Sequence, residues 1–391
     1  MRFSEFQGEW EKHGLSEYLD FKNGLNPDSK RFGKGIKFIS VMDILNNPVI
    51  TYDCIRASVQ ATDTEISSFS VENGDILFQR SSETLEDVGR ANVYIDDRVA
   101  VFGGFVIRGK KKANYNPLFF RYLLSSPYAR KRIIPMGAGA QHFNIGQEGL
   151  SKVLLNFPSI EEQTKIASLL HLLDERIATQ SKLIEDLKKL KSAIIDYAIN
   201  SLDTDFAKFG SLYEMAGEGG TPTTSNASFY DNGNIPFIKI DDLKQKYLTE
   251  NKDFITELGL QKSSAWLVPT HSILFSNGAT IGEISITTYP VCTKQGILGI
   301  VPKQNIDVEF LYYFMSSSYF KKAVRRIVTE GTMKTAYLKD INNILCPIPT
   351  KEKQQEIAKM PSTLNSKIDF EQSILKLFCS QKQYLLRQMF I

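Results

Sequence analysis

The chain has 391 residues, of which 42% are hydrophobic and 23% charged, and its formal net charge is +3. This length accommodates two or three domains, and so small a charge does not by itself indicate a nucleic-acid partner. No apolar run approaches the roughly 20 residues that a membrane-spanning helix needs. The polar N-terminus lacks the apolar core of a signal peptide, so we expect a cytoplasmic protein. The four cysteines are scattered, which disfavours structural zinc and a disulfide framework.

Residues 1–157 are predicted to form a first module of mixed secondary structure. Short β-branched and aromatic runs predict strands, and a longer amphipathic run over 117–134 predicts one helix. The predicted strands are 36–39, 76–78, 93–95 and 99–102. Turn signals such as Asn73-Gly74 separate these strands. The segments expected to be loops are 45–70, 80–92 and 105–115.

Residues 158–200 are predicted to form one long helix. Ser159 and Glu162 have the spacing of a capping box at its start. Residues that are mostly apolar then recur alternately four and three positions apart, which is the heptad seam of a coiled coil and requires a partner helix. The apolar seam residues are Ile166, Leu170, Leu173, Ile177, Ile184, Leu187 and Ile194. A second apolar stripe, which one partner helix would leave uncovered, consists of Leu169, Leu172, Leu183 and Leu190.

The second half of the chain repeats the first, and this repeat supplies the partner helix. Residues 201–348 are predicted to be a second module and 349–391 a second long helix. Adding 191 to the seam numbers gives a second seam whose apolar residues are Leu364, Ile368, Leu375, Phe378 and Leu385. The polar seam positions Gln180 and Lys191 are matched by Glu371 and Lys382.

One position breaks the symmetry of the two predicted helices. Pro361 lies on the second seam where the first has Leu170. Proline inside a helix removes one backbone hydrogen bond and kinks or breaks the helix. We therefore expect the second helix to begin effectively near Ser362.

The two modules share their landmarks and differ in their loops. Residues 36–44 resemble 235–243, and 76–78 resemble 273–275, whereas the segments between these landmarks do not match. A common frame with different loops is expected of two modules that do the same job on different targets. Drift of surface loops is the alternative explanation.

The arrangement resembles the specificity subunit of Type I restriction-modification systems over nearly the whole chain. Each short motif is weak alone, and their order, duplication and position before two long helices carry the resemblance. The motifs are FQGEW at 6–10, GDILF at 74–78, Gly139 with Gln141 and Asn144-Ile145, FP at 157–158 with EEQ at 161–163, GGTP at 219–222, IPFI at 235–238 and LLRQMF at 385–390. Residues 331–337 depart from the glycine-glutamine-asparagine-isoleucine pattern in the second module.

This resemblance implies an α/β mixed (α+β) fold with a pseudo-twofold internal repeat. Two target-recognition domains would be joined by two long antiparallel coiled-coil helices, and each domain would read one half of a split, asymmetric DNA site. The helices would set the gap between the half-sites and would dock two copies of a methylation subunit. That subunit would carry S-adenosylmethionine and methylate adenine, and a restriction subunit would join to cleave. The chain itself would have no catalytic site, cofactor or metal.

Candidate DNA contacts are cations for phosphates and polar side chains on loops for bases. They are Lys34, Lys37, Gln79, Arg80, Ser81, Lys111, Gln141, His142, Asn277 and Lys334. A solvated surface is the alternative for each basic cluster, and Arg325 with Arg326 fits that alternative best because the other face of their helix is apolar. With DNA of about 34 Å per turn, half-sites about one turn apart fit two modules facing one side of the duplex.

Two other classes of function remain open at this point. The chain could be a structural adaptor whose two modules bind protein, or a stand-alone DNA methyltransferase. The second is disfavoured because Asn116-Pro117-Leu118-Phe119 lacks the second proline of the adenine methyltransferase motif and follows no cofactor loop. Salt-dependent binding to duplex DNA would distinguish a specificity subunit from an adaptor.

Overall fold

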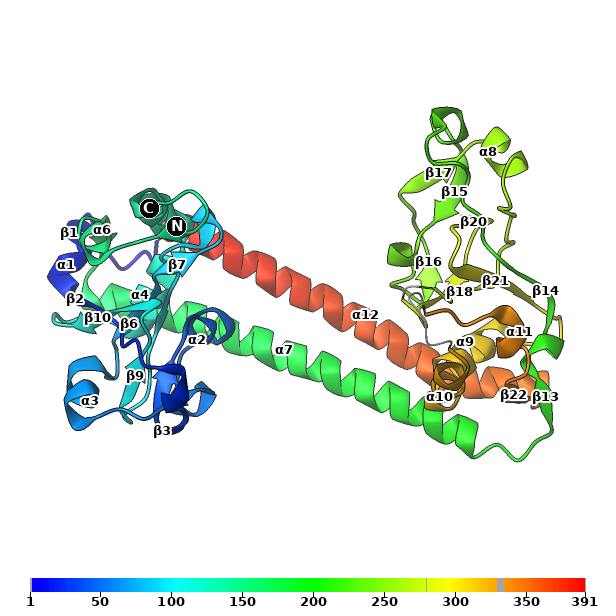
Figure 1. The fold of residues 1–391 in the computed structure, drawn as a ribbon, viewed down its shortest axis with the longest axis horizontal. Helices are drawn as coiled ribbons and strands as arrows, with labels where there is room; N and C mark the ends of the chain where they lie inside the picture. Colours follow the sequence, from blue (N-terminus) through cyan, green and yellow to red (C-terminus); the bar gives the residue numbers. More distant parts are fainter. Residues whose placement is uncertain (1, 279, 329–333, 391) are drawn as a thin grey trace. The chain divides into compact units, whose positions relative to one another are not determined.

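The computed structural model describes residues 2–278, 280–328 and 334–390. These residues form two compact units, and each long helix contributes one half to each unit (Figure 1). Unit 1 comprises residues 1–181 and 373–391, and unit 2 comprises 182–372. Among the described residues, no helix is long and apolar enough to cross a membrane.

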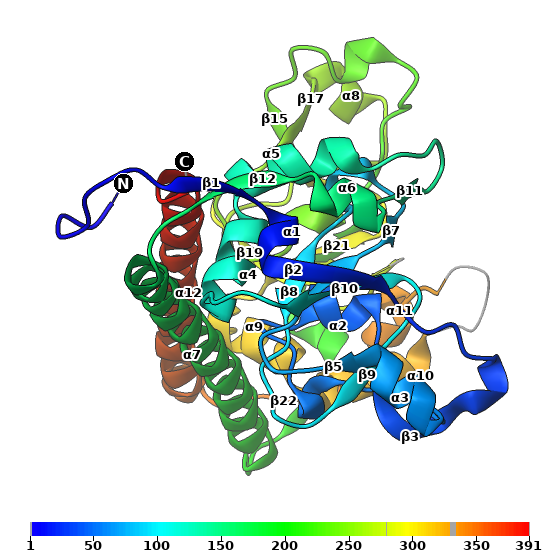
Figure 2. The ribbon, with the colours of Figure 1, turned by 90° about the vertical axis from the view of Figure 1, so that its left-hand side faces the viewer.

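Unit 1 is built around a four-stranded antiparallel sheet. Its strands, in spatial order, are β2 (Leu19–Asn23), β10 (Val106–Lys111), β6 (Ile76–Gln79) and β8 (Ala91–Val93). β2 and β10 run side by side in Figure 2. The helices α4 (Pro117–Ser125) and α5 (Pro127–Ile133) follow, and their buried Phe119, Phe120 and Ile133 belong to one apolar core with Ile76 and Phe78.

A second small sheet and several short elements complete unit 1. The sheet has the order β4 (Ser58–Val59), β3 (Phe32–Ile39), β9 (Ala100–Phe102) and β5 (Ser70–Val71), with β3 and β9 parallel. The strand pairs are β1 (Glu11–Gly14) with β12 (Leu154–Phe157), and β7 (Ser81–Ser82) with β11 (Phe143–Asn144). The remaining short helices are α1 (Leu15–Tyr18), α2 (Val41–Asn46), α3 (Asp63–Phe69) and α6 (Gln147–Ser151).

Unit 2 has the same plan. Its main sheet has the order β14 (Tyr213–Glu218), β21 (Ile297–Pro302), β18 (Ile273–Ser276), β19 (Ile284–Thr287) and β16 (Tyr247–Leu248). The second sheet has the order β17 (Asp253–Ile255), β15 (Ile235–Ile238) and β20 (Cys292–Thr293), with β15 and β20 parallel. The other elements are β13 (Phe206–Lys208), α8 (Glu257–Gln261), α9 (Val308–Ser316), α10 (Ser318–Ile327), α11 (Leu338–Ile341) and β22 (Leu345–Pro347).

The internal repeat reaches individual side chains. The buried Gln163 accepts a hydrogen bond from the Asn116 amide (3.1 Å) and donates one to the Pro158 carbonyl (3.0 Å). The buried Gln354, 191 positions later, accepts from the Asp307 amide (2.8 Å) and donates to the Pro349 carbonyl (2.9 Å). In each unit one glutamine therefore ties the start of a long helix to the start of α4 or α9.

The long helices are α7 (Ile160–Asn200) and α12 (Lys351–Gln388). All predicted apolar seam residues are buried or half-buried. In unit 1 the Asp174 carboxylate pairs with Lys382, and in unit 2 the Lys191 ammonium donates to Asn365 Oδ1 at 2.9 Å. From the first pair to the second, the residue number rises along α7 (174 to 191) and falls along α12 (382 to 365). The two helices therefore pack antiparallel.

At the start of α7, only one of the two hydrogen bonds of the predicted capping box is present. Ser159 Oγ accepts from the Glu162 amide at 3.4 Å, which is a long cap. The buried Glu162 carboxylate instead accepts from Arg2 Nε at 2.7 Å and Nη2 at 2.6 Å. A contact distant in sequence thus replaces the reciprocal bond of the box.

Several local predictions were wrong. Residues 117–134 form α4 and α5 because Ser126 ends one helix and caps the next, accepting from the Ala129 amide at 3.2 Å; Ser317 does the same between α9 and α10. The three segments expected to be loops contain regular structure: residues 45–70 contain β4 and α3, 80–92 contain β7 and the start of β8, and 105–115 contain β10, whose repeat equivalent is β21.

The prediction for Pro361 was also wrong, because α12 continues through this residue. In the first turn of α12, Gln354 anchors the helix to the Asp307 amide and the Pro349 carbonyl. Just after Pro361, Ser362 Oγ accepts from Lys246 Nζ at 3.0 Å and from the Tyr313 hydroxyl at 3.1 Å. These contacts hold the backbone in place despite the one hydrogen bond that proline removes.

Candidate nucleic-acid interface

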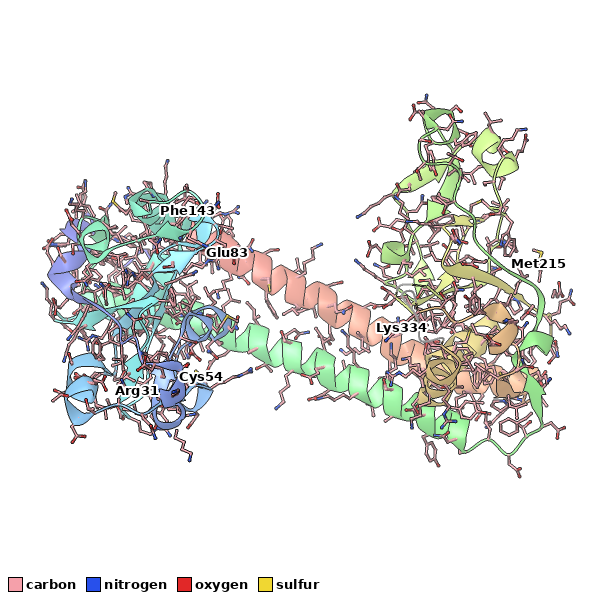
Figure 3. The ribbon with its side chains drawn as sticks, in the orientation of Figure 1. Arg31, Cys54, Glu83, Phe143, Met215 and Lys334 are labelled. Carbon is pink, nitrogen blue, oxygen red and sulfur yellow. The ribbon has the colours of Figure 1, made fainter. Side chains whose placement is uncertain are left out.

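In unit 1 the structure brings two of the predicted groups together at the end of β6. The Arg80 carbonyl accepts from the Ile145 amide at 2.9 Å, and Ser81 Oγ hydrogen-bonds to Asn144 Oδ1. β7 and β11 pair here, on the side of the unit where Figure 3 labels Glu83 and Phe143. The strand end and the glycine-led loop therefore form one surface.

Gln141 and His142 lie exposed in that loop. The loop is closed by the bridge between Ala138 and Asn144, whose amides and carbonyls pair at 2.9 Å. Gly139 has φ +145°, and a Cβ there would lie 2.0 Å from the His142 carbonyl oxygen. Glycine is therefore required at this position, and it presents Gln141 and His142 to solvent.

Unit 2 repeats this junction with different residues. The Asn277 carbonyl accepts from the Ala336 amide at 2.9 Å, and Asn277 Nδ2 donates to the Ala336 carbonyl at 3.3 Å. Lys334 is exposed two residues earlier (Figure 3). Residues 331–333 of the predicted glycine-led loop lie outside the described residues.

Two of the predicted base-reading side chains are buried. Gln79 is 5% exposed and donates to the Ser81 carbonyl at 2.9 Å, and Asn277 is 1% exposed. Gln79 Oε1 and Asn277 Oδ1 have no hydrogen-bond donor within the described part of the chain. In this structure neither amide is presented at the surface, and each instead supports the junction it belongs to.

The predicted cations divide into solvent-facing and internally bonded side chains. Lys34 is exposed on β3, whereas Lys37 Nζ donates to the Ile55 carbonyl at 2.6 Å. Lys111 Nζ donates to the Tyr115 carbonyl at 3.1 Å, and Arg80 Nη1 donates to the Gly104 carbonyl at 3.2 Å. Figure 3 places Arg31, beside β3, at a different end of unit 1 from Phe143. Lys34 and Lys37 thus do not share a surface with Gln141 and His142.

Other charged groups near these surfaces are structural. Arg31 pairs with Glu65 and lowers the pKa of that carboxyl to about 2. Arg130 donates to the carbonyls of Glu86 (2.8 Å) and Val88 (2.7 Å), and burial lowers its pKa to about 10.

Within the described ranges, no cluster of three or more His, Cys, Asp or Glu side chains could hold a metal ion. Asn116 caps α4, accepting from the Phe119 amide at 3.0 Å.

The sequence reasoning missed a polar cluster on the seam of unit 1. Asp174 accepts from the Tyr122 hydroxyl at 2.8 Å and Arg121 Nη1 at 3.2 Å, in addition to Lys382. Burial opposes ionisation of Asp174, but the hydrogen bond and charge of Lys382 outweigh it and lower its pKa. The offset of 191 already places Lys382 on the seam, but only the antiparallel packing of the two helices brings it beside Asp174.

Comparison with known proteins assigns the whole architecture. The family model for the Type I restriction modification DNA specificity domain matches twice, over residues 7–189 and 203–377. The Type I restriction enzyme MjaVIII specificity subunit of Methanocaldococcus jannaschii is 22% identical over 400 residues, covering 95% of this chain and 92% of the relative.

Solved structures share the fold. The S subunit of a Type I restriction-modification system from M. genitalium matches with a TM-score of 0.58 and 16% identity, covering 100% of this chain and 99% of that one. A chain from a structural study of complex assembly and conformational transition in the type I R-M system matches with a TM-score of 0.62 and 14% identity, covering 98% and 97%. The two family-model matches span most of the chain, and the chain therefore belongs to the family of Type I restriction-modification DNA specificity subunits.

Proposed function

We propose that this chain reads a bipartite, asymmetric DNA sequence and directs adenine methylation and restriction by partner subunits to it. The observation that carries the proposal is the double match to a DNA specificity domain, one copy on each half of an internally repeated chain. The specificity subunit is non-catalytic, and catalysis belongs to the partner subunits. The match supports neither the adaptor nor the stand-alone methyltransferase.

The asymmetry of the site follows from the loops. The two units keep the same sheet order around β10 and β21, yet β6 and β8 are joined by residues 80–90 whereas β18 and β19 are joined by the shorter 277–283. The corresponding strand-end junctions present Gln141 and His142 in unit 1 and Lys334 in unit 2. Different side chains on a common frame support different half-sites.

The exposed apolar side chains of the long helices support docking of two methylation subunits. Each lies directly before a seam residue, so together they flank one side of each seam. In unit 1 they are Leu169, Leu172, Leu377 and Tyr384, and in unit 2 Leu183, Leu190, Tyr197, Met360 and Phe370. Exposed apolar side chains that recur along a helix in this way are typical of a protein-binding site. Two such patches, one per unit, fit two copies of a partner, and S-adenosylmethionine would be held by that partner. We place the assembly in the cytoplasm, where its DNA substrate lies.

The decisive experiment is a map of methylated adenines in cells that carry this chain together with its methylation subunits. We expect one split motif that disappears when the chain is deleted and returns when it is restored. A methylation pattern that does not depend on the chain would overturn the proposal. Binding of the reconstituted complex to duplex DNA that weakens steeply with salt would separate it from a protein adaptor.

A further inference from the structure

Unit 2 contains an open groove between the end of β18 and α10. Its floor is apolar and includes Phe275, Phe320 and Val324. Three cations line it, Lys321 and Arg325 from α10 and Lys334 from the strand-end junction described above, together with one carboxylate, Glu283. The groove therefore combines an apolar floor with an excess of positive charge at its walls.

In unit 1 the longer connection between β6 and β8 takes up part of the corresponding space, and the groove that remains there is lined by residues that include Glu86, Arg90, Leu124, Arg130 and Ile134. Val88 in that connection is fully buried, and a Cβ placed on Gly137 would lie 2.6 Å from Val88 Cγ1. Gly137 is the repeat equivalent of Val328, which lines the groove of unit 2. Arg130, the equivalent of Lys321, is bonded to the carbonyls of Glu86 and Val88. The described residues of the shorter connection of unit 2 supply no such carbonyl partner, and Lys321 faces the groove.

The groove cations form no ion pair within the part of unit 2 that the structure describes. Lys321, Arg325 and Lys334 are exposed, and none of them pairs with a carboxylate of the described residues. Lys322 and Arg326, on the same helix and also exposed, do not line the groove. The ten residues of α10 thus carry two cations that face a groove and two that do not, which separates a binding wall from general surface charge.

A phosphodiester backbone matches this chemistry. Its phosphates need cations, and its sugars present apolar edges that can pack on the floor. We propose that this groove binds the phosphodiester backbone of the DNA half-site read by unit 2, with Lys321, Arg325 and Lys334 as the phosphate contacts. The inference rests on the proposed function and assigns the backbone contact to cations of unit 2 that the groove of unit 1 does not match, since the equivalent of Lys321 is the carbonyl-bonded Arg130 and the equivalent of Arg325 is Ile134.

The test compares two variants of the full chain in complex with its methylation subunits. One is Lys321→Gln/Arg325→Gln/Lys334→Gln, and the other is Lys322→Gln/Arg326→Gln. Affinity for a short duplex carrying the methylated motif is measured across a salt series. Removing the cation from one phosphate lowers the slope of log affinity against log salt by about 1, so we expect a fall of about 3 for the groove variant. The second variant should keep nearly the wild-type slope.

Several outcomes decide the matter. A groove variant that keeps the wild-type slope, or two variants that lose slope equally, overturns the groove as the phosphate site while leaving the proposed function intact. A wild-type complex that does not bind the duplex overturns both. Displacement of DNA by inorganic phosphate beyond that by chloride at equal ionic strength assigns the groove to a free anion and overturns the backbone contact. A Lys321→Arg/Arg325→Lys variant that recovers the slope shows that charge, and not altered folding, is responsible.

Discussion

At the scale of single residues, the pair of Asp174 and Lys382 makes a stability prediction that depends on pH. Asp174→Asn removes the charge from a half-buried acceptor of three hydrogen bonds, and should cost about 1–3 kcal/mol at neutral pH. Because the folded pKa of Asp174 is lowered, the stabilisation is present above the unfolded pKa of about 3.9 and disappears as pH falls through the folded value. Hydrogen exchange of the α7 amides in unit 1 should show a difference from wild type at pH 7 that vanishes in acid. An equal difference at both pH values would contradict the role of the charge.

Unit 2 supplies the reciprocal experiment. Lys191 donates to the neutral amide of Asn365, whose Nδ2 donates in turn to Asp369 at 3.0 Å. Burial lowers the pKa of Lys191, and the charge of Asp369 opposes this shift. Asn365→Asp/Asp369→Asn should give Lys191 the charged partner found in unit 1 without placing two carboxylates side by side. It should raise the stability of unit 2 by about 1 kcal/mol at neutral pH, because hydrogen bonds between ionised partners are the stronger ones. Slower hydrogen exchange in the α7 segment of unit 2, with none in unit 1, is the expected result. Faster exchange would show that the second charge costs more in desolvation than it gains.

At the scale of elements, the exposed stripe on the long helices predicts where the methylation subunits bind. Leu183→Glu/Leu190→Glu places charge on the apolar stripe of unit 2 without touching the seam. Native mass spectrometry should then show one methylation subunit per chain in place of two. The matched control is Ser192→Glu, which adds charge at an exposed position of the same helix outside the stripe. Two bound subunits in the stripe variant would exclude this surface as a dock.

The continuity of α12 makes a second prediction for an element. The backbone at Pro361 is already helical, so Pro361→Leu would restore the hydrogen bond to the Ile357 carbonyl and copy the seam residue of the first helix. We expect α12 to gain about 1–3 kcal/mol. The urea midpoint of the full chain, followed by helical circular dichroism, should rise. A fall would mean that leucine is too large for this part of the seam, since overpacking also destabilises.

These elements also show which features a sequence can predict. Both seams were predictable because heptad spacing is a local pattern, and the offset of 191 paired them. β10 was missed because Gly109 and Lys110 to Lys112 resemble a loop, and its strand character depends on β2 and β6 on either side. The burial of Gln79 and Asn277, and the open groove beside α10, follow from packing between segments distant in sequence. No local pattern carries that information.

At the scale of the whole molecule, the gap in the DNA site should depend on the length of the long helices. The boundary between the two units falls after Ser181 in α7 and after Gln372 in α12. Residues inserted at these two points therefore leave the packing within each unit unchanged. Three heptads in each helix keep the seam in phase and add roughly 32 Å at 1.5 Å per residue. That is close to one turn of DNA at about 34 Å, so both half-sites would keep their face of the duplex.

We therefore expect the methylated motif to keep both halves and to lengthen its gap by about nine base pairs. The same number of residues inserted into the linker 201–205, between α7 and β13, should leave the gap unchanged. A methylome in which the helix insertion preserves the original gap would show that the spacing is set elsewhere.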